Sequence, residues 1–369
     1  MFIKTNTGTV SSKSTFDPAR AEAFAGRLLQ VLNDGALCLM ASIGHRTGLF
    51  DCLRDQPPLT SEEIASRAGL NERYVREWLG AMVTSKVITV DPETHLYQLP
   101  AEHAAYLTRI AGVDNLAVFT QYISVLGNVE DEIVECFKNG GGVPYESYVR
   151  FHRVMAEDSG LAVLPNLESH ILPLVPGLVE RLGQGLSVLD AGCGSGRVLN
   201  RMAELFPSSH FVGMDLSAEA ITAGRNDAIK RQLRNVEFIQ IDLGNFDETA
   251  DPDSFDLITT FDAVHDQGQP LKLLKGIYRG LKSNGVYLMQ DIKGSSYVHQ
   301  NIEHPMGTFL YTASCLHCMT VSLAQGGEGL GAMWGEEKTR DYLRRAGFSS
   351  VETHQLEHDI NNNWYVVRK

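Results

Sequence analysis

The stretch that most constrains the fold is residues 188–196, which read VLDAGCGSG. Its apolar start is typical of a buried strand, and residues 197–206 then follow a helical pattern. Glycines at 192, 194 and 196 allow a tight turn and leave bare backbone at the start of the helix. The pattern predicts a strand, a glycine turn and a helix that together bind a nucleotide-like ligand.

Two further strand patterns follow, and each ends in an acidic residue. Residues 210–214 lead into Asp215, and residues 236–241 lead into Asp242. An acid about 20 residues after such a turn is placed to accept hydrogen bonds from ribose hydroxyls. The second acid is placed to reach an adenine amino group. A glycine turn with only a packing role is the alternative, and the order of strand, turn, helix, strand and acid argues against it.

Asp190, just before the first glycine, separates two kinds of nucleotide ligand. A carboxylate there repels a pyrophosphate and attracts a cationic amino-acid group and a sulfonium. The order Asp190, Asp215, Asp242 resembles that of the class I S-adenosylmethionine-dependent methyltransferases, over about residues 186–369. The resemblance implies an α/β fold with a Rossmann-like seven-stranded sheet and S-adenosylmethionine as the cofactor. The expected cofactor-binding residues are Asp190, Gly192, Gly194, Gly196, Asp215, Leu216, Asp242, Leu243, Phe261 and Asp262.

Length, charge and cysteine content limit the function classes. The 369 residues exceed a typical single domain, and we expect a division into residues 1–100, 101–176 and 177–369. A formal net charge of −13 argues against general nucleic-acid binding. Residues 1–15 have no apolar signal-peptide core, and no stretch approaches the roughly 20 apolar residues of a membrane span. Six dispersed cysteines suggest reduced thiols and a cytoplasmic protein.

Residues 17–100 have a different character. Small and apolar residues recur at helical spacing over residues 17–53 and predict packing helices. Two short helices follow. One starts at Thr60 or Ser61, with Ser61 as its expected cap, and the other is capped by Asn71. Two strands come next, over residues 87–90 and 96–99. Helix, turn, helix and wing describe a winged-helix domain.

A winged helix raises the alternative of a DNA-binding regulator. Only Arg73, Arg76 and Lys86 are candidate phosphate or base contacts, and acidic residues outnumber them in this segment. The domain resembles the N-terminal domain of plant-type small-molecule O-methyltransferases and of related bacterial methyltransferases. That resemblance implies packing and dimerisation, so we expect a homodimer that binds neither nucleic acid nor membrane.

The fourth strand pattern, residues 255–260, leads to the candidate catalytic residues. His265 and Asp266 fall just past the carboxyl edge of the sheet, where α/β folds bind ligands. Histidine can remove a hydroxyl proton near neutral pH, and the pair resembles the His-Asp of plant-type O-methyltransferases, whose histidine is the general base. Gln267 replaces the usual tryptophan, so we expect an acceptor pocket that is built differently. A His265 that only braces its loop is the alternative.

The acceptor-side residues are expected from three segments. Residues 145–155 have aromatic side chains at helical spacing, a fifth strand over residues 285–289 leads to an acid, and an insert over residues 294–335 contains several histidines. The candidates are Tyr145, Tyr148, His152, Asp291, His304 and His317. Core packing of these side chains is the alternative. Residues 336–346 predict a helix, and residues 351–354 and 364–367 predict the antiparallel end of the sheet.

The sequence CLHC at residues 315–318 suggests a metal site only weakly. Its cysteines and histidine lack a second pair of ligands at a recognisable spacing, so we expect no metal. The sequence thus predicts a dimeric S-adenosylmethionine-dependent methyltransferase that acts on a small molecule, with oxygen as the favoured acceptor. An N- or S-methyltransferase is one alternative. A catalytically silent S-adenosylmethionine-binding regulator that acts through its winged helix is the other.

Overall fold

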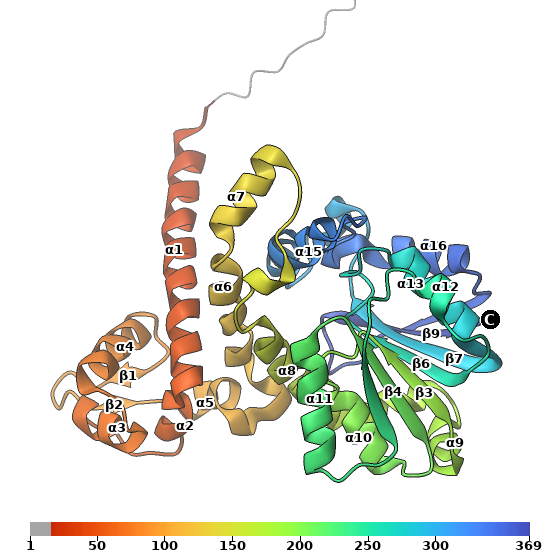
Figure 1. The fold of residues 1–369 in the computed structure, drawn as a ribbon. Helices are drawn as coiled ribbons and strands as arrows, with labels where there is room; N and C mark the ends of the chain where they lie inside the picture. Colours follow the sequence, from red (N-terminus) through yellow and green to blue (C-terminus); the bar gives the residue numbers. More distant parts are fainter. Residues whose placement is uncertain (1–15) are drawn as a thin grey trace, which may run out of the picture. The chain divides into compact units, whose positions relative to one another are not determined.

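The computed structural model of the protein describes residues 16–369, so the interpretation of residues 1–15 lies outside the described residues (Figure 1). The chain forms two compact units, one ending at His103 and one running from Ala104 to Lys369. Each unit has its own core and is described separately. The further division at residue 176 stays a prediction.

The first unit is a winged helix preceded by a long helix. Its elements are α1 (Pro18–Thr47), α2 (Leu49–Leu53), α3 (Ser61–Ala68), α4 (Glu72–Thr84), β1 (Thr89–Val90) and β2 (Tyr97–Gln98). Thr60 rather than Ser61 caps α3, in a capping box with Glu63, and Asn71 caps α4 as predicted. The Trp78 indole donates to the Met40 carbonyl and packs against Phe50, which fixes α4 on α1 and α2.

Helix α1 departs from the prediction of a packed helix. Only its last turns are buried, at Ala41, Ser42, Gly44 and His45. The apolar side chains that recur along α1 at spacings of four and seven residues are 44–71 % exposed, namely Phe24, Leu28, Leu32, Leu39 and Ile43. This exposed stripe lies on a helix about 45 Å long.

The second unit has the predicted α/β architecture. Its strands are β3 (Ser187–Ala191), β4 (His210–Asp215), β5 (Val236–Gln240), β6 (Phe255–Phe261), β7 (Leu281–Ile292), β8 (Ser350–His354) and β9 (Asn362–Arg368). They form one seven-stranded sheet in the order β5-β4-β3-β6-β7-β9-β8. The first five strands pair in parallel, and β9 runs antiparallel between β7 and β8.

Helices cover both faces of this sheet (Figure 1). One face packs against α9 (Leu178–Gln184), α10 (Arg197–Leu205) and α11 (Ala218–Lys230). The other packs against α12 (Phe246–Thr249), α13 (Pro270–Gly280) and α16 (Gly335–Ala346). Since a parallel sheet is buried on both faces, its central strands β3 and β6 are buried over most of their length. The carboxyl ends of β3 to β7 therefore share one edge.

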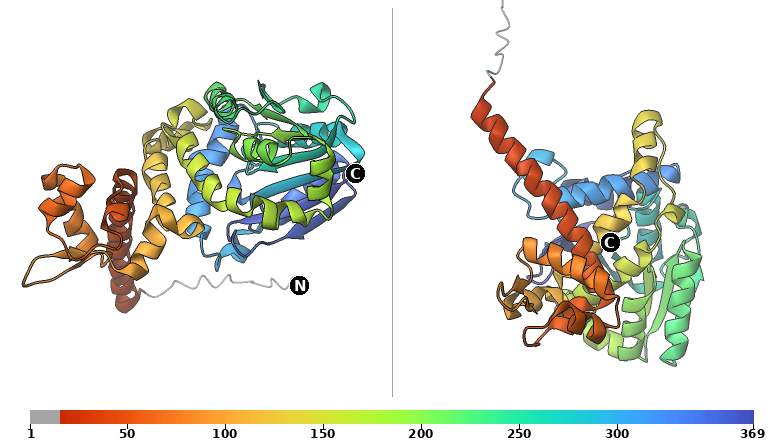
Figure 2. Two further views of the ribbon diagram at one scale, coloured as in Figure 1. Left: turned by 90° about the horizontal axis from the view of Figure 1, so that it is seen from below. Right: turned by 90° about the vertical axis from the view of Figure 1, so that its left-hand side faces the viewer.

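Helices before the sheet and in the insert share another core. These are α6 (Thr120–Gly127), α7 (Glu130–Asn139), α8 (Phe151–Ala162), α14 (Gly307–Ala313) and α15 (Met319–Ala324). Helix α5 (Ala101–Leu107) precedes them in the chain. Figure 2 shows the α6–α8 helices and the insert against the sheet domain. Short 3₁₀ or π segments are η1 (Arg109–Asp114), η2 (Leu116–Val118), η3 (Tyr145–Ser147), η4 (Leu164–Asn166), η5 (Leu167–Ile171), η6 (Leu172–Leu174), η7 (Val298–Asn301), η8 (Ser314–Cys318) and η9 (Ala332–Trp334).

The expectation of one helix through residues 145–155 was wrong. Arg150 has a φ of 72°, in the left-handed region, and α8 begins only at Phe151. Tyr145 belongs to the short η3 turn instead. The break turns the chain between the two groups of aromatic side chains, which periodicity alone does not reveal.

Within residues 16–369, none of the helices taken singly has the length and apolar character needed to cross a membrane. Phe151–Leu174 and Leu178–Gln184 meet those criteria only as a pair, and the two are bent by 104°.

Candidate active site at the carboxyl edge of the sheet

The glycine turn after β3 has the predicted left-handed backbone. Gly192, Gly194 and Gly196 have φ values of 80°, 52° and 64°. The Gly192 amide donates to the Met214 carbonyl, which fixes the turn against the end of β4. A Cβ atom at residue 192 would lie 2.6 Å from the Cβ of Ala263. The turn therefore contacts directly the loop that continues to His265.

Three carboxylates follow the strands beside this turn. Asp190 ends β3 and is buried, its Oδ1 accepts a hydrogen bond from Thr259, and burial raises its pKa to about 7. Asp215 ends β4 and accepts hydrogen bonds from the Gly194 and Ser217 amides, both at 2.8 Å. Asp242 follows β5, is exposed, and accepts from the Gly244 amide. Since a carboxylate oxygen accepts more than one hydrogen bond, Asp215 can hold the turn and still accept from ligand hydroxyls.

The remaining predicted cofactor residues lie at the same edge. Leu216 is 53 % exposed, whereas Leu243 is buried. Phe261 ends β6 and packs on Trp364, and Asp262 follows with a φ of 51°. Burial raises the pKa of Asp262 well above its usual range, and the nearby His265 opposes the rise. The acids, the bare turn and the exposed Leu216 are suited to a cationic, ribose-bearing ligand.

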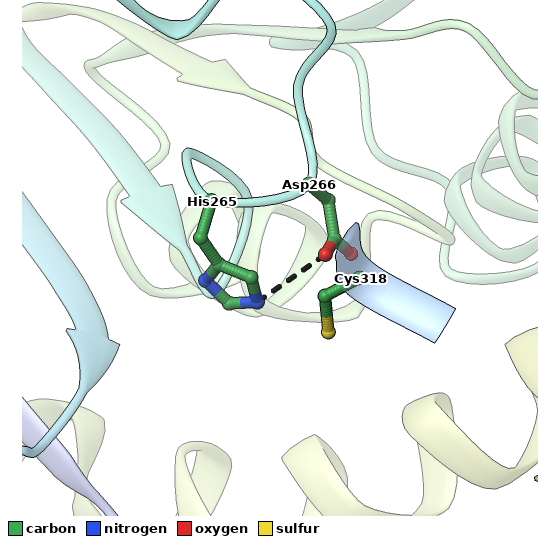
Figure 3. Close-up of side chains that lie close together, drawn as sticks. All are labelled: His265, Asp266 and Cys318. Carbon is green, nitrogen blue, oxygen red and sulfur yellow. Dashed lines mark ion pairs between the residues drawn. The ribbon is translucent and has the colours of Figure 1, made fainter. Parts of the chain in front are cut away.

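His265 lies on the loop after β6 and is only 3 % exposed. Its Nδ1 donates to Oδ1 of Asp291, 2.8 Å away at the end of β7. Its Nε2 lies 3.3 Å from Oδ1 of Asp266, and Cys318 lies beside this pair (Figure 3). Burial acts to lower the pKa of His265, but the carboxylates of Asp291 and Asp266 outweigh it and hold that pKa well above the usual range.

Asp291 has a different place from the one expected. The sequence suggested contact with an acceptor, but Asp291 is fully buried and its Oδ1 also accepts from the Trp334 indole at 2.9 Å. Its Oδ1 is therefore engaged by two side chains. This arrangement orients His265 and leaves Asp291 away from the surface.

His317 is buried among aromatic rings near the same centre. It stacks on Phe151 with ring centroids 3.6 Å apart and meets the edges of Tyr145 and Tyr148. Its Nδ1 lies 3.9 Å from Oδ2 of Asp266, beyond hydrogen-bond distance. Neither ring nitrogen has a hydrogen-bond partner among the described residues, and burial lowers the pKa of His317 to about 4.

His152 and Tyr145 connect this aromatic group to the cofactor edge. The Tyr145 hydroxyl lies 3.3 Å from Nδ1 of His152, and Nε2 of His152 lies 3.3 Å from the hydroxyl of Ser217. Ser217 follows Asp215 by two residues, so α8 reaches the end of β4. Burial lowers the pKa of His152. The side chain is thus placed between the aromatic group and the glycine turn.

Tyr148 and His304 are less suited to ligand binding. The Tyr148 hydroxyl donates to the Leu316 carbonyl at 2.5 Å, and the ring is buried in the core of α6–α8 and the insert. His304 accepts from the Met306 amide and lines a hollow of about 550 Å³ formed by the insert alone. The residues that line this hollow include neither the glycine turn nor the His265 loop.

Sequence reasoning did not assign Cys318, Trp334 and Phe151 to the site. The CLHC sequence pointed to Cys318, but its neighbours His265 and Asp266 come from a distant loop. Trp334 follows the glycine-rich part of the insert, and only the fold brings it to Asp291. Phe151 lacked a signal because its stacking partner His317 lies far along the chain.

Two family models match the chain. Residues 35–109 match the Rv2258c-like winged HTH domain, and residues 182–347 match a methyltransferase domain. Among curated proteins, a malonyl-[acyl-carrier protein] O-methyltransferase of Bacillus cereus is 24 % identical over 176 residues, which cover 46 % of this chain and 55 % of that protein. The chain thus spans little more than half the length of this relative. A methyltransferase of Aspergillus campestris is 23 % identical, and the match covers 68 % of this chain and 69 % of that protein.

Solved structures share the fold over nearly the whole chain. Human N-acetylserotonin methyltransferase in complex with S-adenosylmethionine superimposes with a TM-score of 0.66 at 19 % identity, covering 96 % of this chain and 99 % of that one. The mitomycin 7-O-methyltransferase has a TM-score of 0.64 at 16 % identity, covering 95 % and 100 %. The chain therefore joins a winged helix-turn-helix domain to a methyltransferase domain and has the fold of the class I S-adenosylmethionine-dependent methyltransferases.

Proposed function

We propose that this chain transfers a methyl group from S-adenosylmethionine to an oxygen atom of a small molecule. The observation that carries the proposal is the contact between the glycine turn and the loop of His265, at Gly192 and Ala263. A cofactor seated on the turn then lies beside a histidine that Asp291 holds in place. Bound S-adenosylmethionine supplies a methyl carbon on a sulfonium, which is open to in-line attack.

The cofactor-side residues have separate roles in this proposal. Asp190 and Asp262 favour the cationic amino-acid and sulfonium groups, since burial makes their charges costly without a cation. Asp215 accepts from the ribose hydroxyls, and Asp242 accepts from the adenine amino group. Leu216 and Leu243 contact the adenine, and the bare turn at Gly192, Gly194 and Gly196 admits the amino-acid moiety.

On the acceptor side, methyl transfer needs an oxygen nucleophile held in line and relieved of its proton. A lone pair of the acceptor oxygen forms the new C–O bond while the C–S bond breaks, which yields S-adenosylhomocysteine. The centre of His265 and Asp266 receives the proton. Because Nδ1 of His265 is hydrogen-bonded to Asp291, Nε2 is the nitrogen that is left to react. Tyr145, His152 and His317 form the wall that the acceptor contacts.

Isothermal titration with S-adenosylmethionine and, separately, NAD tests the cofactor. Micromolar binding of S-adenosylmethionine alone is expected. Incubation with phenols, carboxylic acids, amines and thiols, followed by mass spectrometry, then tests the acceptor, and methylated hydroxyl compounds are expected. Binding of NAD alone would overturn the proposal. Products confined to amines or thiols would replace it by N- or S-methylation, which needs less help from a base.

Replacement of Asp215 by alanine tests the ribose contact. We expect a loss of about 1.5–3 kcal/mol in the free energy of S-adenosylmethionine binding, typical of hydrogen bonds to a charged group. Titration calorimetry measures it. Glu237→Ala, on the neighbouring strand β5 with an exposed side chain, is the control and should bind normally. Unchanged affinity of Asp215→Ala would remove Asp215 from the cofactor site.

We further propose a homodimer built on the stripe of α1. The apolar side chains there recur at spacings of four and seven residues and are exposed in the described chain. A second copy of the same helix buries a stripe of this kind by symmetric pairing. The double variant Leu28→Glu/Leu32→Glu places charges in that interface.

Light scattering after size-exclusion chromatography is expected to give a dimer for the wild type and a monomer for the double variant. Gln30→Glu, on the exposed part of α1 where Gln30 donates to Asp34, is the matched control and should stay dimeric. A wild-type monomer would contradict the proposal, and so would a dimer that survives both glutamates.

The winged helix, in this proposal, does not bind nucleic acid. Arg73 forms an ion pair with Glu77, and Arg76 with Glu72, so acidic neighbours on α4 offset both arginines. This local balance agrees with the net charge of −13 and disfavours the silent regulator. All six cysteines are unpaired, which suits the cytoplasm that we propose as its location.

A further inference from the structure

Three chemically different ligand groups converge beside the proposed methyl-transfer site. A ring nitrogen of His265, a carboxylate oxygen of Asp266 and the sulfur of Cys318 all lie within 4.8 Å of one another (Figure 3). His265 and Cys318 are buried, and Asp266 is largely so. Because cysteine, histidine and aspartate are the side chains that bind zinc in proteins, we propose that these three bind a divalent transition-metal ion, with zinc preferred.

The spacing of the nitrogen and oxygen donors is suited to a tetrahedral ion. Bonds of 2.0–2.1 Å to nitrogen and oxygen place two tetrahedral ligands about 3.3 Å apart. Nε2 of His265 and Oδ1 of Asp266 are 3.3 Å apart. A cysteine sulfur selects zinc or another soft ion over magnesium and calcium, which prefer oxygen ligands.

The surroundings of His265 resemble the second layer of a metal site. A histidine that binds a metal through one nitrogen usually donates its other N–H to a carboxylate. His265 donates Nδ1–H to Asp291, and Trp334 donates to the same oxygen from the other side. This arrangement fixes the ring so that Nε2 points toward Asp266 (Figure 3).

The charge of the centre also favours a cation. Asp262, Asp266 and Asp291 surround His265, and within the described residues the ion pairs of Asp266 and Asp291 are formed with histidines only. Buried carboxylates are costly without opposite charge. A divalent ion balances two of them.

Three protein ligands leave one tetrahedral position open, as in catalytic zinc sites. His317 is buried with both ring nitrogens unpartnered in the described part of the chain, and its Nδ1 faces Asp266 at 3.9 Å. It can hydrogen-bond to a water or an acceptor atom in that position. The ion would bind a hydroxyl or thiol acceptor and lower its pKa, with the proton passing to water before the methyl group is transferred.

This inference rests on the proposed function and replaces direct proton uptake by Nε2 of His265, because one nitrogen cannot do both. The test uses the full chain, freed of metal with a chelator and then supplied with Zn²⁺ or Co²⁺ alone. After gel filtration we expect one zinc ion per chain by mass spectrometry. The cobalt form is expected to show a thiolate-to-cobalt charge-transfer band and the strong visible bands of a tetrahedral ion.

Cys318→Ser should abolish the charge-transfer band, whereas Cys315→Ser, three residues earlier in the same helical segment, should keep it. Asp266→Asn removes a second proposed ligand and should also weaken zinc binding. Asp291 only orients His265, so Asp291→Asn should weaken zinc binding by about 10–100-fold. No retained metal, or a cobalt band that survives in Cys318→Ser, would overturn the inference. Methyl transfer by the metal-free chain would overturn it too but leave the proposed function intact, whereas metal binding without S-adenosylmethionine binding would defeat only that function.

Discussion

The His265→Ala variant is expected to lose about 10²–10⁴-fold in kcat/KM for methyl transfer, the range for removal of a group that activates a proton-bearing nucleophile. The loss should appear in kcat, because His265 activates the acceptor rather than binding the cofactor. S-adenosylmethionine affinity should change little, since the glycine turn and Asp215 are untouched. The expectation holds whether Nε2 takes the proton or binds an ion, because alanine removes either role.

Steady-state kinetics with the acceptor found by screening, together with calorimetry, measure both quantities. His170→Ala is the control, because His170 is exposed and its ring contacts only His358 among the aromatic pairs described. Wild-type kcat in His265→Ala would assign this histidine to bracing its loop. A loss of thermal stability that parallels the loss of activity would also indicate a bracing role. His265→Gln keeps a polar group at this position and so separates the effect on stability from the effect on catalysis.

The second large effect is expected in the glycine turn. Gly194 and Gly196 both have left-handed backbone, so alanine at either costs about 1–2 kcal/mol. A Cβ at residue 196 would also clash with the ring of Phe238. A Cβ at residue 194 would meet no described atom within 4 Å. Overpacking adds about 1–3 kcal/mol, so Gly196→Ala should lose about 2–5 kcal/mol of unfolding free energy.

Urea denaturation of the two variants without ligand measures this difference. Because the backbone cost is shared, the excess loss of Gly196→Ala over Gly194→Ala isolates the contact with Phe238. Gly196→Ala combined with Phe238→Leu should recover part of the excess, since the smaller side chain leaves space. Equal losses in the two alanine variants would show that the turn shifts freely and that Phe238 does not brace it.

Much of the fold could be predicted because its signals are local. The acids at Asp190, Asp215 and Asp242 follow apolar runs, and the cap at Asn71 depends on the amide of Arg73, two positions away. The antiparallel end of the sheet was also predicted correctly, as β8 and β9. In each case the physical cause lies within about twenty residues of its effect.

The remaining features depend on contacts between distant segments. No local pattern shows that Arg150 interrupts a helix or that Asp291 is buried against Trp334. The expectation of no metal considered ligands close together in sequence, and the fold instead places Cys318 beside His265 and Asp266 from another loop. Likewise, periodicity identifies the apolar stripe of α1 but not what covers it.

The segment η8 is a π turn, and it places two side chains of the proposed metal centre. Residues 307–324 run as α14, η8 and α15, and His317 and Cys318 are both buried in the middle segment. A π turn contains one residue more than an α turn, and each helical residue rotates the chain by about 100°. Deleting a single residue there would rotate the rest of the helix by about 100° about its axis. His317 and Cys318 would then no longer lie beside Asp266. Gain or loss of one codon can therefore create or abolish this chemistry within an otherwise unchanged fold.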